Sequence, residues 1–116
     1  MIGTWMNYKT VVQGIACARL TGNLSSESVQ VRIQEEHKRR LSQQLASARR
    51  QLENLERQAN RTGDSEGFAD QINREKTLIS RLQRQLDDTR NVRSKYENRV
   101  DEIYREMRRL GCRNIA

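Results

Sequence analysis

Apolar residues recur at intervals of four and three positions along the second half of the chain. Thirteen positions between 68 and 110 follow this spacing without interruption, and ten of them are apolar. These positions are Phe68, Ile72, Glu75, Ile79, Leu82, Leu86, Thr89, Arg93, Tyr96, Val100, Ile103, Met107 and Leu110. Such a heptad seam is typical of a helix that supercoils with another helix. We therefore predict one long helix over residues 68–110, which Gly111 ends.

A shorter stretch upstream carries the same spacing. Six apolar residues are again four and three positions apart: Leu41, Leu45, Ala48, Leu52, Leu55 and Ala59. No helix-breaking residue interrupts residues 25–62, and the hydroxyl of Ser25 is a suitable N-cap acceptor. We predict a first helix over 25–62. Two glycines, an aspartate and a serine fall within residues 63–67, which predicts a turn that Asp64 or Ser65 caps.

A short turn between two heptad helices predicts an all-α fold, a long antiparallel helical hairpin that forms a two-helix coiled coil. Folding the chain about residue 65 brings the seams into register, with small alanines opposite larger residues. The predicted layers are Ala59 with Ile72, Leu55 with Glu75, Leu52 with Ile79, Ala48 with Leu82, Leu45 with Leu86, Leu41 with Thr89, Val31 with Val100 and Leu24 with Met107. Helices that pair in trans between chains are the alternative, because a seam does not identify its partner.

Residues 1–22 are predicted to form a separate segment at the open end of the hairpin, called the base. A spacing of three, four and three residues, typical of a short amphipathic helix, relates Trp5, Tyr8, Val12 and Ile15. The β-branched run at residues 10–12 leaves a strand as the alternative. With residues 111–116 as a C-terminal tail, residues 1–116 would form a single elongated domain.

Composition restricts the class of protein. The chain has 116 residues, of which 34% are hydrophobic, 32% charged and 4% aromatic, and it lacks proline. So little apolar material cannot fill a large globular core, which argues against a pocketed α/β enzyme and favours packing against partners. The N-terminus does not resemble a signal peptide, and no apolar run approaches the roughly 20 residues of a membrane span. We expect no membrane partner and synthesis in a cytoplasm, with a virion or a cell-envelope machine as a further destination.

The chain is basic, with a net charge of +7, and arginine supplies 18 of its 22 cationic residues. Three adjacent pairs are candidate contacts for a polyanion: Arg39, Arg40, Arg49, Arg50, Arg108 and Arg109. Most cations are interleaved with carboxylates at helical spacing, as in Glu53–Arg57, so a solvated, ion-paired face explains them equally well. Nucleic-acid binding would therefore be independent of base sequence.

One zone of the seam is polar. The register places Lys38 opposite Arg93, so that two cations face each other across the hairpin. A locally loosened coiled coil, with Glu35 and Glu97 close enough to compensate, is the preferred interpretation. The alternative is a site at which a partner supplies carboxylates or phosphate.

The sequence predicts no catalytic, metal or cofactor site and no small-molecule substrate. His37 is the sole histidine and has no nucleophile motif around it. Cys17 and Cys112 are too far apart for a zinc pattern. The hairpin would bring both cysteines to its base, where a disulfide is geometrically conceivable. In a reducing cytoplasm we expect two free, buried thiols instead.

These features predict a non-enzymatic structural or assembly protein, a homo-oligomer or a component of a larger multisubunit complex. A bacteriophage particle and a secretion or injection machine are examples. The predicted contact residues are Phe68 at the hairpin tip and, at the base, Trp5, Tyr8, Ile33, Tyr104 and Ile115. The first alternative is a basic protein that packages nucleic acid. The second is a coiled-coil adaptor or regulator that docks on a partner helix.

Overall fold

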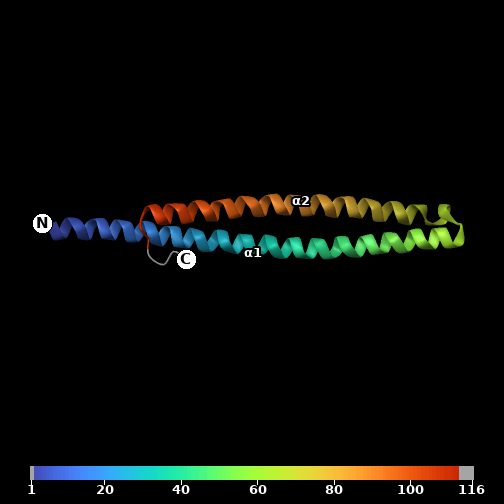
Figure 1. Cartoon of the computed structure of the whole chain (residues 1–116), viewed down its shortest axis with the longest axis horizontal. Helices are drawn as coiled ribbons and strands as arrows, with labels where there is room; N and C mark the ends of the chain where they lie inside the picture. The colour runs from blue at the N-terminus through green and yellow to red at the C-terminus, as the bar shows by residue number, and fades with distance from the viewer. Residues whose placement is uncertain (1, 113–116) are drawn as a thin grey trace. The chain divides into compact units, whose positions relative to one another are not determined.

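Two long helices make up the fold. The computed structural model describes the backbone of residues 2–112 and the side chains of residues 11–112. Its helices are α1 (Ile2–Thr62) and α2 (Ser65–Arg109), with no strand among the residues described. Figure 1 shows them side by side and antiparallel, joined by a tight turn. The predicted all-α hairpin is confirmed, and the helices pair within one chain rather than in trans.

The chain divides into two compact units, each with part of both helices: residues 34–92, and residues 1–33 with 93–116. The 34–92 unit holds the main buried cluster, made of Leu41, Leu45, Ala48, Leu82 and Leu86, with Leu78 and Ile79 packed against it. Arg49 donates from Nη2 to Gln83 Oε1 at 3.4 Å, immediately beside the predicted Ala48–Leu82 layer. The observed contacts therefore agree with the predicted register.

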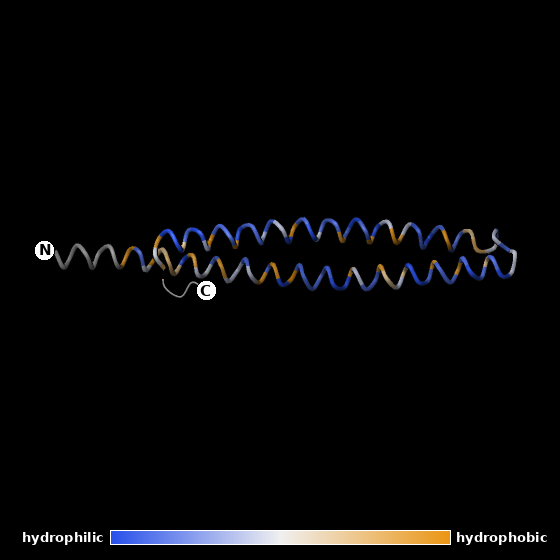
Figure 2. Tube along the Cα trace, viewed as in Figure 1, coloured by the Kyte–Doolittle hydropathy of each residue, from blue (hydrophilic) through white to orange (hydrophobic). Residues whose placement is uncertain are grey.

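Burial follows the predicted seam. Hydrophobic positions recur along both helices in Figure 2. The buried seam residues are Leu41, Leu45, Ala48, Leu55, Ala59, Leu82, Leu86, Thr89 and Met107. The half-buried ones are Leu52, Phe68, Ile72, Glu75, Ile79, Arg93, Tyr96, Val100, Ile103 and Leu110. The seam is therefore the surface that holds the two helices together, as expected for a heptad pattern.

The turn is made by two capping interactions. Gly63 has a φ of 71°, and its N–H donates to the Ala59 carbonyl at 3.0 Å, which closes the last turn of α1. Asp64 Oδ1 accepts from the Gly67 N–H at 3.0 Å and so caps the start of α2. Of the two predicted caps, Asp64 is the one that the structure uses.

The N-terminal part of the chain differs from the prediction. Residues 2–22 do not form a separate segment, because α1 runs without interruption from Ile2 to Thr62. The heptad spacing continues upstream of Val31 through four positions that are half-buried, namely Glu27, Leu24, Leu20 and Cys17. A helical glycine such as Gly22 costs only about 1 kcal/mol relative to alanine, which is too little to end a helix without proline. The predicted boundary at residue 25 and the alternative strand are both wrong.

The carboxyl end of α2 turns back toward α1. Gly111 has a φ of 69° and donates its N–H to Arg108 O at 3.1 Å, while the Cys112 N–H reaches Met107 O at 2.9 Å. This pair of bonds is a Schellman motif, whose left-handed position favours glycine. Gly111 ends α2 as predicted, and the motif fixes the direction of Cys112.

Candidate interaction surfaces

A disulfide between Cys17 and Cys112 joins α1 to the residues that follow α2, with the two Cα atoms 5.7 Å apart. The prediction of free thiols is wrong, and the geometric alternative is the one observed. Two local features bring the two cysteines together. Cys17 occupies a seam position of α1, and the Schellman motif carries Cys112 back to that seam. Cys112 is buried there, with 9% of its surface exposed.

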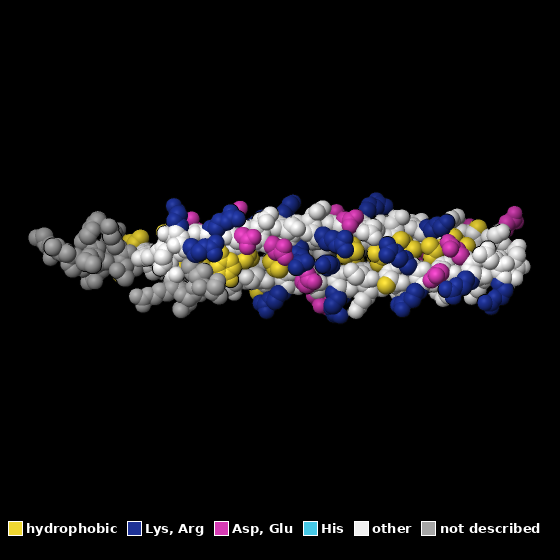
Figure 3. All heavy atoms as spheres, viewed as in Figure 1, with side chains coloured by type: hydrophobic (Ala, Val, Ile, Leu, Met, Phe, Trp, Pro, Cys, Tyr) yellow, Lys and Arg dark blue, Asp and Glu magenta, His cyan; other side chains and the backbone are white. Residues whose placement is uncertain are grey.

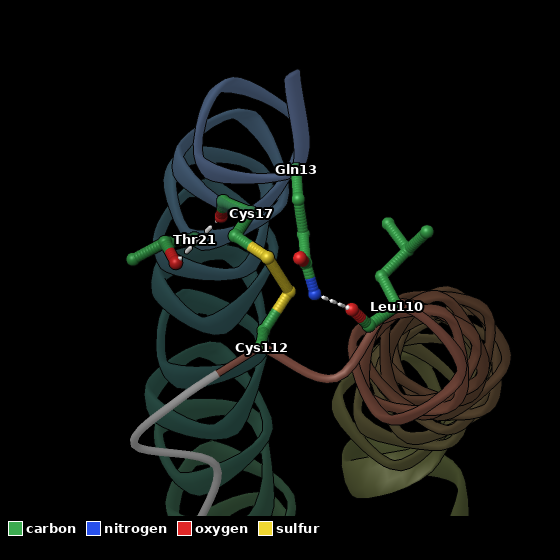
Figure 4. The surroundings of a disulfide bond; sticks show 5 residues. All are labelled: Gln13, Cys17, Thr21, Leu110 and Cys112. Carbon is green, nitrogen blue, oxygen red and sulfur yellow. Dashed lines mark hydrogen bonds between the residues drawn. A yellow bond between two sulfur atoms is a disulfide. The ribbon is translucent and has the colours of Figure 1, made fainter. Parts of the chain in front are cut away.

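A hydrogen bond accompanies the disulfide. The Gln13 side-chain amide donates from Nε2 to the Leu110 carbonyl, which has no partner within α2. Figure 4 shows Gln13 and Cys17 on the same side of α1, directed toward Leu110 and Cys112. Gln13 precedes Cys17 by four residues, the next step of the seam spacing. The sequence prediction missed Gln13, although tracing the seam past residue 25 reaches it.

Apolar side chains are exposed on the part of α1 that belongs to the unit of residues 1–33 and 93–116. The exposed fractions are 59% for Val11, 48% for Val12, 57% for Ile15, 39% for Val29 and 50% for Ile33. Val12 and Ile15, two positions of the predicted short amphipathic helix, are therefore exposed on α1. Ile33, a predicted partner contact, is open to solvent. Five of the six large hydrophobic residues that are exposed among the described side chains therefore lie on this part of α1.

The other predicted contact residues are less accessible. Tyr104 is half-buried in the unit of residues 1–33 and 93–116, and Phe68 is half-buried in the first turn of α2. The side chains of Trp5 and Tyr8, and all of Ile115, lie outside the described residues. Phe68 therefore presents only part of its ring to a partner at the tip.

Most of the paired arginines are engaged within the chain, although all six are exposed. Arg39 donates to both Glu36 carboxylate oxygens at 3.0 and 2.6 Å, and Arg40 lies 3.4 Å from the same group. The hydrogen bond from Arg39 lowers the pKa of Glu36, and the same bond raises the pKa of Arg39.

The arginines near the end of α2 show the same arrangement. Arg109 donates from Nε to Glu106 Oε2 at 3.1 Å, and this bonding raises the pKa of the Arg109 guanidinium. Among the described residues, Arg50 and Arg108 make no ion pair or side-chain hydrogen bond. Cationic and anionic side chains alternate along the face shown in Figure 3. This face is therefore a mixture of charges rather than a continuous basic track.

The two cations of the polar seam zone have carboxylates on their own helices. Lys38 Nζ lies 4.0 Å from Glu35 Oε1 in the 34–92 unit. Arg93 Nε lies 3.0 Å from Glu97 Oε1 in the other unit. The acids that the sequence offered as compensation therefore lie within ion-pair distance of the two cations.

Two shallow grooves lie between the helices, one in each unit. The groove in the 34–92 unit has a volume of about 670 Å³, and its lining includes Gln44, Gln51, Arg81 and Gln85. The groove in the other unit has a volume of about 290 Å³ and is lined by Ser28, Val31, Glu97, Val100 and Asp101. Both are open, mixed surfaces without a converging set of nucleophile, base and acid.

Near the smaller groove, an arginine links the two helices. Arg99 Nη1 lies 3.7 Å from Glu27 Oε2 on α1, and its guanidinium carbon is 5.3 Å from the centre of the Tyr96 ring. The ion pair and the cation–π contact hold this arginine against the helix surface. It therefore contributes to packing between the helices of this unit.

Chemical sites are not apparent in the described part of the chain. No group of three or more His, Cys, Asp or Glu side chains there is arranged to hold a metal ion. His37 is exposed on α1. Neither helix contains a stretch, within the described residues, that is apolar enough to cross a bilayer. Comparisons with protein-family models, curated proteins and solved structures find no match.

Proposed function

We propose that this chain is a non-enzymatic assembly protein, a helical-hairpin subunit of a multisubunit complex such as a bacteriophage particle or a secretion or injection machine. The observation that carries the proposal is the exposed apolar surface of α1, which includes Val11, Ile15 and Ile33. These side chains are not needed for the hairpin seam, which the opposite face of α1 provides. A partner protein is the ordinary means of covering such a surface.

The energetics favour burial of this surface. Full burial of a valine or isoleucine side chain contributes about 1.5–3 kcal/mol. The chain is otherwise strongly hydrophilic, with a mean hydropathy of −0.97. Five of the six large hydrophobic side chains that are exposed among the described residues lie on α1, and covering them would supply the driving force for assembly.

The disulfide supports an assembly that functions outside a reducing cytoplasm. Disulfides persist in oxidising environments such as the periplasm, the cell exterior and the surface of a virion. The Cys17–Cys112 bond connects residues 95 positions apart in sequence. It therefore joins the end of α2 to α1 covalently. Such a link would stabilise the fold of a subunit that functions where no cellular chaperones are present.

The test is the mass of the purified chain by light scattering after size exclusion, with absorbance at 260 and 280 nm, in low and high salt. We expect a protein-only species heavier than the 13.6 kDa chain that persists in high salt, because apolar contacts resist screening. A nucleic-acid complex in low salt that becomes a bare monomer in high salt would contradict the proposal.

Nucleic-acid packaging is the weaker candidate. Exposed arginines such as Arg50 and Arg108 favour it. The engagement of Arg39, Arg40 and Arg109 with carboxylates argues against it, because each ion pair must be broken or shared to bind phosphate. Packaging predicts affinity that falls steeply with salt concentration.

A further inference from the structure

Four of the five large apolar residues exposed on the described part of α1, all except Val12, belong to a longer stripe on one face of the helix. Seven positions share this face, and all of them are exposed: Val11, Ile15, Ala18, Gly22, Ser26, Val29 and Ile33. At about 100° per residue, the stripe lies roughly half a turn away from the seam positions Cys17, Leu20 and Leu24. We call these seven positions the outer stripe. It lies wholly within the unit of residues 1–33 and 93–116.

The outer stripe is symmetric about its central residue. Its intervals are four, three, four, four, three and four, so the spacing is the same in both directions from Gly22. The chemistry is symmetric as well. Large β-branched residues occupy the two outermost positions at each end, and small residues occupy the three central positions. A stripe that reads alike in both directions is complementary to itself in an antiparallel arrangement.

We propose that two copies of this chain pack antiparallel through their outer stripes, about a two-fold axis at Gly22. In this arrangement Val11 meets Ile33 of the second copy, and Ile15 meets Val29. This inference rests on the proposed assembly function and names the partner as a second copy. It buries the most exposed apolar side chains of both copies in an isologous interface.

The small central residues allow the helices to approach. A Cβ added at Gly22 would meet nothing within 4 Å, so the centre of the stripe is open space in the single chain. Glycine, alanine and serine at helix contacts reduce the distance between axes and bring the flanking β-branched residues into contact. The eleven-residue spacing from Val11 to Gly22 and from Gly22 to Ile33 equals about 3.67 residues per turn. Helices with this repeat stay in contact with little left-handed supercoiling.

Charge is compatible with the antiparallel arrangement. The exposed cations that border the stripe are Arg19 and Arg32. In the antiparallel dimer, Arg19 lies at the level of Ser25 of the second copy and Arg32 at the level of Val12. Neither arginine is then at the same level as its counterpart, which limits repulsion between them.

A matched pair of variants tests whether the outer stripe is the dimer interface. Val29→Glu places a carboxylate in the stripe, and Val92→Glu makes the same change on α2, outside it. The two valines are similarly exposed, at 39% and 36%. We expect Val29→Glu to lower the dimer association constant at least 100-fold in high salt and Val92→Glu to leave it unchanged. Circular dichroism of both variants checks that the helices remain folded.

A charge exchange tests whether the two copies pack antiparallel or parallel. Ile15→Glu and Val29→Lys should each give monomers, because each leaves an unpaired charge in the interface. The double variant should recover the dimer, because antiparallel packing puts the new carboxylate at position 15 of one copy against the new ammonium at position 29 of the other. Parallel packing would instead put like charges together and make the double variant the weakest. Failure of the double variant to recover the dimer, with helicity intact, would overturn the antiparallel arrangement.

The outcomes separate this inference from the proposed function. An oligomer that survives high salt and is unaffected by Val29→Glu overturns the outer-stripe dimer and leaves the assembly function standing. A wild-type monomer free of nucleic acid at every concentration also overturns the dimer, and cross-linking in the native source then decides whether another protein is the partner. A species that exists only with nucleic acid overturns both.

Discussion

At the scale of single residues, position along the helix decides whether an apolar side chain stabilises the fold or faces solvent. Leu82 is buried, with 5% of its surface exposed, whereas Val92 on the same helix is 36% exposed. Both are aliphatic, and only Leu82 lies on the heptad seam. Thr89 is buried although it is polar, because its seam position places it against α1.

Leu82→Asp should therefore disrupt the hairpin. It places an unpaired carboxylate in the main cluster, and we expect a loss of at least about 3 kcal/mol in the free energy of unfolding. Val92→Asp, the control, should change that free energy by less than about 1 kcal/mol. Urea unfolding followed by circular dichroism measures both. Equal stability of the two variants would mean that the seam is misplaced.

The cap of α2 has a smaller, defined effect. Asp64→Ala removes the acceptor of the Gly67 N–H and should cost about 1 kcal/mol of unfolding free energy. Asp70→Ala removes the same charge from an exposed position within α2 and should have little effect. Thermal unfolding of the two variants distinguishes a specific cap from a general effect of charge.

The Glu36–Arg39 pair predicts a titration. The hydrogen bond from Arg39 lowers the pKa of Glu36 in the folded chain. Its contribution to stability is therefore present above the unfolded-state pKa and is lost as the pH falls through the folded-state pKa. In an NMR titration, Arg39→Gln should raise the pKa of Glu36, whereas Arg57→Gln should leave it unchanged. An unaltered Glu36 pKa in Arg39→Gln would show that the pair is absent in solution.

At the scale of the elements, glycine has opposite roles at different positions. Gly22 has no positive φ and space around it, whereas Gly63 adopts a φ of 71° in the turn. Gly22→Ala, made in the Val29→Glu background to keep the chain monomeric, should stabilise α1 by up to about 1 kcal/mol. Gly63→Ala should destabilise the hairpin by about 1–2 kcal/mol, because alanine is strained in the left-handed region. If both substitutions raised the melting temperature, or both lowered it, the opposite roles of the two glycines would be contradicted.

Long-range periodicity predicted the extent of α2, and together with the turn at residues 63–67 it predicted the hairpin register. The start of the first helix was predicted at residue 25 instead of residue 2, because Thr21, Gly22 and Asn23 resemble a turn when taken by themselves. The unbroken seam spacing continues through Leu20 and Leu24, which are half-buried, and in the structure it outweighs the turn-like residues.

The interaction surfaces were only partly predictable. Ile33 was identified as a contact residue, and the structure places it on the face of α1 away from the seam, with 50% of its surface exposed. The outer stripe could not be recognised from the sequence because residues 1–22 were treated as a separate segment, whereas the stripe runs from Val11 to Ile33. The disulfide could not be predicted from local sequence patterns. Its formation depends on the direction of the chain after the Gly111 motif, which places Cys112, and on the redox state of the compartment.

At the scale of the whole molecule, the disulfide ties residues far apart in sequence. Reduction frees the end of α2 from α1, and closing a loop of this length stabilises a chain by about 2–4 kcal/mol. We expect reductant to lower the melting temperature of the wild type and to leave Cys17→Ser/Cys112→Ser unchanged. Hydrogen exchange should show the loss of protection concentrated near Met107 and Leu20. A wild type that melts at the same temperature with and without reductant would show that the bond is not formed.

Sedimentation equilibrium of the oxidised wild-type chain in high salt measures whether two copies associate. For self-association through the outer stripe we expect a mass that rises with concentration toward twice the 13.6 kDa of one chain, without absorbance from nucleic acid. A mass equal to one chain at every concentration would contradict it.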